Sequence, residues 1–177
     1  NGANKIDTFA FMPIESFTLA ISTYTGQNVG ANDYDRVHQG TLAGMKISVA
    51  VSILVAVFLY PTGGWMMQMF SQSPEVIQAG EAYLHCVLPG YFLLAISFVL
   101  NSVMRGAGEA IVPMVSSVLA FWFVRVPAAY WIAAVWGKDF IFVSYPIGWA
   151  VGILISGLYY RTGRWKSKGI ASRSSQD

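Results

Sequence analysis

One carboxylate in an apolar stretch is the first residue of this sequence that could do chemistry. Glu15 lies within FMPIESFTLAI, residues 11–21, where the neighbouring residues are mostly apolar. Ionisable residues within a membrane-spanning helix are rare, and they usually face a cavity or another charge and mark the path of an ion or a substrate. Glu15 could therefore bind a cation or exchange a proton, or it could lie at the membrane surface or form a structural ion pair.

Hydroxyl side chains continue from Glu15 along one face of the same predicted helix. Thr18, Ser22 and Thr25 follow Glu15 at i+3, i+7 and i+10, and these spacings place all four residues on one face. A polar stripe on an otherwise apolar helix requires either a water-filled cleft or a partner helix. We therefore take Thr18, Ser22 and Thr25 as candidates to line a cleft.

Two further polar side chains lie in apolar stretches. Arg125 could hold an anionic group, neutralise Glu15 or bond to the carbonyl groups of a neighbouring helix. We favour structural pairing, with Glu15 as the expected partner. Asn101, within LNSVMRGAGEA, could coordinate an ion or form a hydrogen bond between helices, which is the commoner role of an amide in a membrane.

The sequence lacks the short motifs that carry common enzyme chemistry. It contains no HExxH, CxxC, GxSxG or GxxxxGK[ST] pattern. The single cysteine, Cys86, allows no disulfide within the chain. The sequence also lacks a basic stripe with interleaved aromatic residues, which binding of nucleic acid would need. We therefore expect neither an enzyme, nor a metal site, nor a nucleic-acid partner.

Composition indicates which elements position these residues. Only 11% of the 177 residues are charged and 55% are hydrophobic, whereas a soluble domain carries about 25% charged residues. Together with apolar runs of about 20 residues, these values predict a multi-pass membrane protein. We expect an all-α membrane bundle of five transmembrane helices, at about residues 3–27, 41–60, 74–104, 113–136 and 140–160.

Proline and glycine mark the expected ends and bends of these helices. Pro61 and the following Thr-Gly-Gly are expected to end the second helix, and Pro89-Gly90 to kink the third. Ser73 and Pro74 are typical of a helix start. Residues 162–177 form a basic tail that we expect to be disordered.

Small residues recur at every fourth position in two of the expected helices. Such ridges allow a neighbouring helix to approach closely. The helix-packing candidates are Gly40, Gly44 and Ser48 in the second helix and Gly148, Gly152 and Ser156 in the fifth.

Lys and Arg are unequally divided between the two predicted sides of the membrane. One side holds Arg36, Arg105 and the basic tail, whereas the other holds Lys5 and Lys138. Because cytoplasmic loops carry an excess of Lys and Arg, this division predicts a cytoplasmic C-terminus.

Three stretches resemble the second half of bacterial multidrug and toxic compound extrusion (MATE) transporters. They are FMPIESFTLAISTYTGQNVGA, LNSVMRGAGEAIVPM and VRVPAAYW. The strongest match is an apolar helix with a proline followed by A-x-S-T-x-x-GQN-x-GA, here residues 20–31. The resemblance covers nearly the whole chain, which begins at Asn1 and which we interpret as part of a longer protein.

The resemblance implies a fold and an activity. Residues 1–161 would be helices eight to twelve of twelve, a partial C-terminal six-helix lobe whose partner is an N-terminal lobe outside this chain. Such proteins, in the bacterial cytoplasmic (inner) membrane, export amphipathic, often cationic drugs in exchange for sodium ions or protons and need no other cofactor. By this resemblance Glu15 and Asn101 are the ion-coupling candidates.

Two other functions stay open from the sequence. A flippase for lipid-linked oligosaccharides has a related fold, but its cleft needs more positive charge than Arg125 alone to hold pyrophosphate. A membrane scaffold without transport activity is the third possibility.

Overall fold

A computed structural model of the chain describes residues 2–70 and 72–168. Within these ranges every regular element is helical, which confirms the all-α prediction. The elements are α1 (Gly2–Gly30), α2 (Tyr34–Phe70), α3 (Pro74–Val87), η1 (Leu88–Gly90), α4 (Tyr91–Gly106), α5 (Ile111–Val118), η2 (Leu119–Arg125), α6 (Val126–Val135), η3 (Lys138–Val143), α7 (Ser144–Thr162) and η4 (Arg164–Lys168). Of the short elements, η2 is a π-helix and the others are 3-10 turns.

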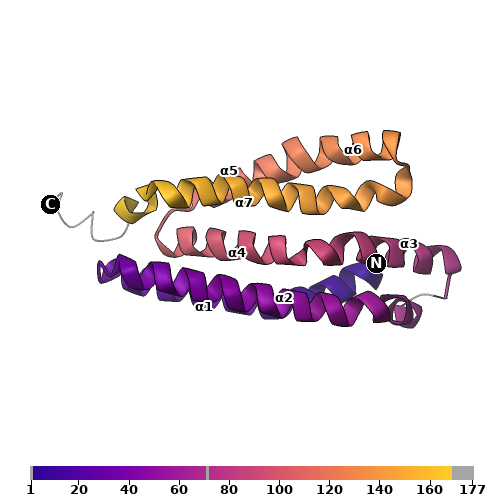
Figure 1. Ribbon diagram of the computed structural model, residues 1–177, viewed down its shortest axis with the longest axis horizontal. Helices are drawn as coiled ribbons and strands as arrows, with labels where there is room; N and C mark the ends of the chain where they lie inside the picture. The colour runs from indigo at the N-terminus through magenta and orange to yellow at the C-terminus, as the bar shows by residue number, and fades with distance from the viewer. Residues whose placement is uncertain (1, 71, 169–177) are drawn as a thin grey trace.

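The helices lie roughly along the long axis of the molecule, with α3 and α4 between α1–α2 and α5–α7 (Figure 1). In the most apolar part of Pro74–Gly106, 67% of the residues are buried, compared with 22% for Tyr34–Met69 and 6% for Ile111–Val135. The α3–α4 rod is therefore the central element, and the outer helices expose most of their apolar surface.

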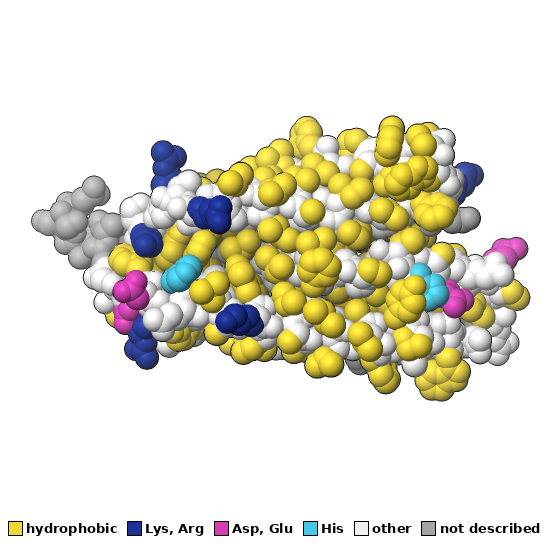
Figure 2. Space-filling model, viewed as in Figure 1, with side chains coloured by type: hydrophobic (Ala, Val, Ile, Leu, Met, Phe, Trp, Pro, Cys, Tyr) yellow, Lys and Arg dark blue, Asp and Glu magenta, His cyan; other side chains and the backbone are white. Residues whose placement is uncertain are grey.

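Four helical stretches are long and apolar enough to cross a membrane: Tyr34–Met69, Pro74–Gly106, Ile111–Val135 and Phe140–Thr162. The 29-residue α1, which carries the polar stripe, is not among these four. On the face shown in Figure 2, hydrophobic side chains cover the middle, and Lys, Arg, Asp and Glu lie mostly toward the two ends. This distribution suits a multi-pass membrane protein.

The predicted bounds of the second helix, 41–60, are wrong at both ends. Its first turns use the polar segment from Tyr34, where the Asp33 carboxylate accepts a hydrogen bond from the backbone N–H of Arg36 at 3.1 Å. At the other end α2 continues through Pro61 to Phe70. Gly63 does not form a turn: a Cβ there would lie 2.8 Å from Leu84 Cδ1, so this glycine admits α3 instead.

The third helix is interrupted where the sequence predicts a kink. The 3-10 turn η1, which contains Pro89 and Gly90, separates α3 from α4. Ser73 is the N-cap residue of α3 and Pro74 follows it, as expected. A Cβ at Gly90 would lie 2.6 Å from Pro146 Cγ, so the turn also brings α7 close.

The fourth and fifth helices lie within two or three residues of their predicted bounds but are not uniform. The π-helix η2 precedes Pro127, which cannot donate a backbone hydrogen bond. The expected disorder of the tail does not hold at its start, because Arg164–Lys168 forms the 3-10 turn η4. Residues 169–177 lie outside the described ranges.

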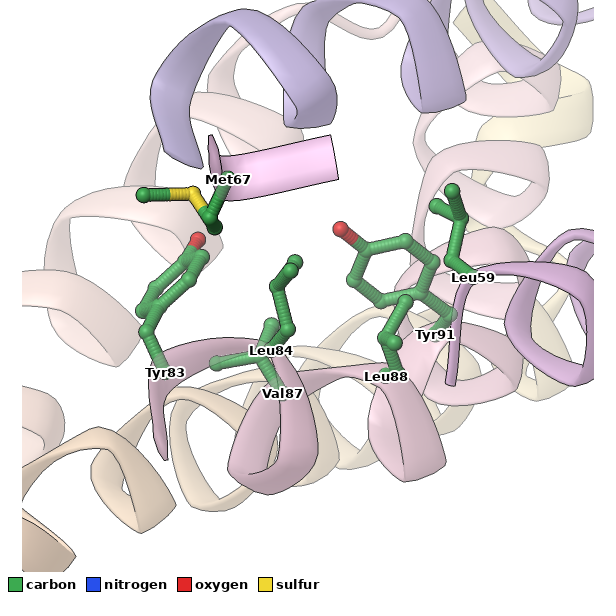
Figure 3. Close-up of a cluster of buried hydrophobic side chains, with 7 residues drawn as sticks. All are labelled: Leu59, Met67, Tyr83, Leu84, Val87, Leu88 and Tyr91. Atoms are coloured by element: carbon green, nitrogen blue, oxygen red, sulfur yellow. The ribbon is translucent and has the colours of Figure 1, made fainter. Parts of the chain in front are cut away.

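Two buried clusters hold the bundle together. One joins α2 to the α3–α4 rod, and Figure 3 shows its members: Leu59, Met67, Tyr83, Leu84, Val87, Leu88 and Tyr91. The other lies toward the opposite end and includes Val37, Val103 and Trp165. Trp165 is 2% exposed and donates from Nε1 to the carbonyl of Tyr160 at 3.0 Å, which fixes η4 onto the bundle.

Candidate functional site

A cavity of about 180 Å³ lies between α4, the α5–η2 segment and α7. It brings together Asn101 and Arg125, two residues that the sequence analysis selects independently. Phe98, Phe121 and Trp149 contribute aromatic walls. A concave, largely apolar space with a few converging polar groups is the usual form of a ligand site.

A hydrogen-bonded network forms one polar side of this cavity. Ser156 Oγ lies 2.9 Å from Asn101 Oδ1 and 3.1 Å from Ser116 Oγ. Ser116 in turn donates to the carbonyl of Gly152 at 3.2 Å. The network ties α4, α5 and α7 together, and in it the amide oxygen of Asn101 accepts one hydrogen bond from Ser156. An amide oxygen can accept two hydrogen bonds, so Asn101 keeps one acceptor position as well as its N–H donors for further contacts.

Arg125 ends the π-helix and packs against aromatic rings. The centre of its guanidinium lies 3.3 Å from the centroid of the Tyr145 ring and 4.7 Å from that of Phe121. Among the described residues no ion pair joins Arg125 to Glu15, which is exposed on α1, so the predicted pairing is wrong. Arg125 instead contacts the ring of Tyr145 in α7.

The polar stripe of α1 faces a partner helix along much of its length. Thr18 and Thr25 are buried, Ser22 is half-buried and Glu15 is exposed. Thr18 donates to the backbone carbonyl of Glu15 at 2.7 Å. The stripe therefore places two threonines in helix contacts and leaves its carboxylate accessible. A cleft-lining role for these residues stays a prediction.

The small residues of the two ridges lie at helix contacts. A Cβ on Gly40 would overlap the Tyr24 ring, and one on Gly44 would lie 2.7 Å from Ile21 Cδ1. The ridge of α7 lies against α4 and η2. A Cβ on Gly148 would lie 3.4 Å from Arg125 Cβ, and one on Gly152 would lie 3.4 Å from Ser97 Oγ. The remaining ridge residues, Ser48 and Ser156, are buried.

Glu109 is a buried carboxylate that the sequence analysis does not select. It is 4% exposed, and its Oε1 accepts hydrogen bonds from the backbone N–H groups of Ile111 at 3.0 Å and Val112 at 3.4 Å. Its Oε2 accepts from the Tyr159 hydroxyl at 3.0 Å. An acid just before a helix start signals such a cap. The contact from α7, 50 residues away, has no local signal.

Replacing Glu109 by alanine should destabilise the protein by about 1–3 kcal/mol, because two N–H donors of α5 and the Tyr159 hydroxyl lose an acceptor. Tyr159→Phe, which leaves the N-cap bonds in place, should cost less. Thermal unfolding of the purified full-length protein in detergent measures both, with the exposed Glu75→Ala as control. Equal melting temperatures for Glu109→Ala and Glu75→Ala would contradict the capping role.

Comparison with known proteins decides the family. The MatE family model matches residues 1–131 of the chain. The chain belongs to the MATE family.

Curated relatives agree with this assignment. The MATE chain is 27% identical to "Probable multidrug resistance protein YoeA" of Bacillus subtilis, over 94% of this chain and 36% of the relative. It is 28% identical to "Probable multidrug resistance protein YpnP" of the same organism, over 92% of this chain and 37% of the relative. "Probable multidrug resistance protein NorM" of Thermotoga maritima is 24% identical, over 96% and 37%. The chain thus spans little more than a third of these relatives.

The described part of this MATE chain offers few groups for a coupling ion. Within it no group of three or more His, Cys, Asp or Glu side chains could hold a metal ion. Asn101 shares its cavity with the cationic Arg125, and its amide oxygen already meets Ser156. Glu15 is an exposed carboxylate on α1, and among the described side chains it forms no ion pair. The ion-coupling role of Glu15 and of Asn101 stays a prediction.

Proposed function

We propose that this chain is part of the C-terminal lobe of a secondary active multidrug exporter. The full-length protein would exchange sodium ions or protons for amphipathic, often cationic drugs, and an N-terminal lobe outside this chain would complete it. The observation that carries the proposal is the match to the MatE family model over residues 1–131. The names of the relatives, which describe probable multidrug resistance proteins, support the substrate class.

Glu15 is the residue that we propose to carry the coupling ion. It lies on a helix with buried hydroxyl side chains, and it is exposed at the surface of the bundle. In alternating access the two lobes move against each other as packed bodies around a central site. The backbones of α1 and α4 are in close contact near Gly106, which leaves these two helices little room to slide past each other. This contact supports movement of the lobe as one packed body.

The basic residues near the chain's C-terminal end support an orientation with that end in the cytoplasm. The Tyr34 hydroxyl donates to the backbone carbonyl of Lys166 at 3.1 Å, so the α1–α2 turn and η4 lie at the same end of the bundle. Arg36 near the start of α2, Arg161 near the end of α7 and Arg164 in η4 lie in or next to these two segments and are exposed. We place this end in the cytoplasm of a bacterium, and the protein in the cytoplasmic membrane.

Bacteria that express the full-length polypeptide should accumulate at least about threefold less ethidium than cells with an empty vector. Holding a threefold concentration ratio needs less than about 1 kcal/mol of free energy from the ion gradient. Fluorescence of loaded cells measures the accumulation. A protonophore or removal of sodium should abolish the difference. Equal accumulation in both strains, at confirmed membrane expression, would contradict the proposed function.

A further inference from the structure

A second cavity, of about 290 Å³, lies at the end of the bundle where η4 folds back. It is formed by the start of α2, the end of α7 and η4. On the face shown in Figure 2, basic, acidic and histidine side chains gather at this end of the molecule. None of the residues that line this cavity has a part in the proposed transport function, so its ligand is a separate question.

The cavity lies at the level of the lipid headgroups. The span Phe140–Thr162 has 23 residues, which extend about 35 Å as a helix. The hydrocarbon core of a bilayer is only about 30 Å thick, so the end of this span at Thr162 reaches the headgroup layer. The span Tyr34–Met69 begins beside the same cavity. Lipid phosphates are therefore close neighbours of this cavity.

Aromatic rings from three segments form the walls of the cavity. The Trp165 ring is stacked on that of Tyr160, with centroids 5.3 Å apart, and meets the Tyr34 ring edge-on at 6.1 Å. Gly163, with a φ of +69°, ends α7 in the left-handed conformation that reverses the chain. The Tyr34 hydroxyl then holds the returning backbone at the Lys166 carbonyl. The cavity is therefore built before any ligand arrives.

Two cationic side chains line this cavity. The Lys166 Nζ atom lies 5.4 Å from the centroid of the Tyr34 ring and 5.8 Å from that of Trp165. Such contacts orient an ammonium group but do not neutralise its charge. Arg161, in the last turn of α7, is exposed. Within residues 2–70 and 72–168, neither cation forms an ion pair, so both charges are available to an anion.

The other titratable side chains of the cavity define its charge. Asp35 is the one acid among the lining residues, so two cations face one carboxylate and the cavity is positive. His38 Nδ1 lies 3.2 Å from the Tyr160 hydroxyl, which engages one of its ring nitrogens. A phosphate ligand should bind more tightly without Asp35, because like charges repel, whereas a headgroup held through its own cation should bind less tightly.

We propose that this cavity binds the phosphate of an anionic phospholipid from the adjoining leaflet, with Arg161 and Lys166 as the anion contacts. Basic pockets between membrane helices on the cytoplasmic side are suited to such headgroups, which agrees with the orientation proposed above. A lipid is the expected source of the phosphate because the bilayer holds it at the level of the cavity. The inference goes beyond drug export and does not depend on it.

Native mass spectrometry of the purified full-length protein tests this inference, since it resolves each bound lipid. The probes are palmitoyl-oleoyl phosphatidylglycerol and palmitoyl-oleoyl phosphatidylcholine, which have the same chains and differ in headgroup charge. The unmutated protein should bind phosphatidylglycerol about fivefold or more tightly, about the contribution of one basic residue near anionic lipid. Inorganic phosphate at the same concentration should not displace the lipid.

Arg161→Gln and Lys166→Gln should each weaken phosphatidylglycerol binding by about threefold or more and leave phosphatidylcholine binding within about twofold. Asp35→Asn should strengthen phosphatidylglycerol binding by about twofold or more, because a like charge leaves the cavity. Arg36→Gln is the matched control, since it removes an exposed arginine at the same end of the bundle that does not line the cavity. It should bind both lipids as the unmutated protein does.

Equal binding of the two lipids to the unmutated protein would overturn the inference, whatever the variants show. So would Arg161→Gln and Lys166→Gln proteins that bind phosphatidylglycerol as Arg36→Gln does. Weaker binding by Asp35→Asn would overturn the assignment of the charges, since the carboxylate would then hold the lipid. Displacement by inorganic phosphate would overturn the lipid as ligand. Ethidium export reports separately on the proposed function, so each can fail alone.

Discussion

Glu15→Gln is expected to lower drug export driven by an ion gradient by about tenfold or more, a loss of about 1.4 kcal/mol of coupling at least. The amide keeps the size and shape of the carboxylate, but it can neither release a proton nor neutralise a bound sodium ion. Glu15 is exposed on α1 and has no ion-pair partner among the described residues, so the substitution breaks no salt bridge there. The measurement is ethidium export by the full-length protein in cells with a sodium or proton gradient.

The matched control is Glu75→Gln, which removes an exposed carboxylate from the first turn of α3. It should leave export within about twofold of the unmutated protein, as surface substitutions of this kind usually change little. Glu15→Gln should also retain normal expression and melting temperature. Normal export by Glu15→Gln in both gradients would show that another residue carries the coupling ion.

Gly106→Leu is expected to prevent correct packing of α1 on α4, at a cost of about 3 kcal/mol or more. A Cβ at Gly106 would overlap the backbone carbonyl oxygen of Ser22 and would lie 2.9 Å from Thr25 Cβ. Backbone cannot yield as a flexible side chain can. Gly26, on the facing helix, already has the carbonyl of Gly106 3.2 Å from its Cβ position, so α1 has no nearby space to move into.

Gly30→Leu provides the matched control for Gly106→Leu. A Cβ at Gly30, at the end of α1, meets no atom within 4 Å. Size-exclusion chromatography in detergent and thermal unfolding should find Gly106→Leu aggregated or strongly destabilised, and Gly30→Leu close to the unmutated protein. A monodisperse Gly106→Leu with an unchanged melting temperature would mean that α1 and α4 do not make this contact.

The helical type and four apolar spans follow from hydropathy, but the two boundaries of α2 depend on tertiary contacts. Pro61 and Gly63 read as a helix end because local propensity favours one there. The structure instead uses Gly63 to admit Leu84, and packing of α3 stabilises the continued helix. At the start of α2, a polar segment is helical because Asp33 caps it and Val37 is buried.

The site is less predictable from the sequence than the helices are. Asn101 and Arg125 could be selected because each is polar in an apolar stretch. Their common cavity depends on helix rotation, which periodicity in one helix does not define. For the same reason the Glu15–Arg125 pairing was a reasonable prediction from charge alone and was wrong. The bond of Ser156 to Asn101 joins residues 55 positions apart, a separation that carries no sequence signal.

Drug transport by the purified full-length protein in liposomes, with an imposed sodium or proton gradient as the only energy source, tests the central claim most directly. We predict that ethidium moves against its concentration gradient when one of these two ion gradients is present. Transport should stop when an ionophore dissipates that gradient, and the Glu15→Gln protein should show about a tenth or less of the rate. Ethidium transport at the same rate with and without either gradient would contradict the assignment of this chain to a cation-coupled multidrug exporter. So would the absence of ethidium transport in both gradients.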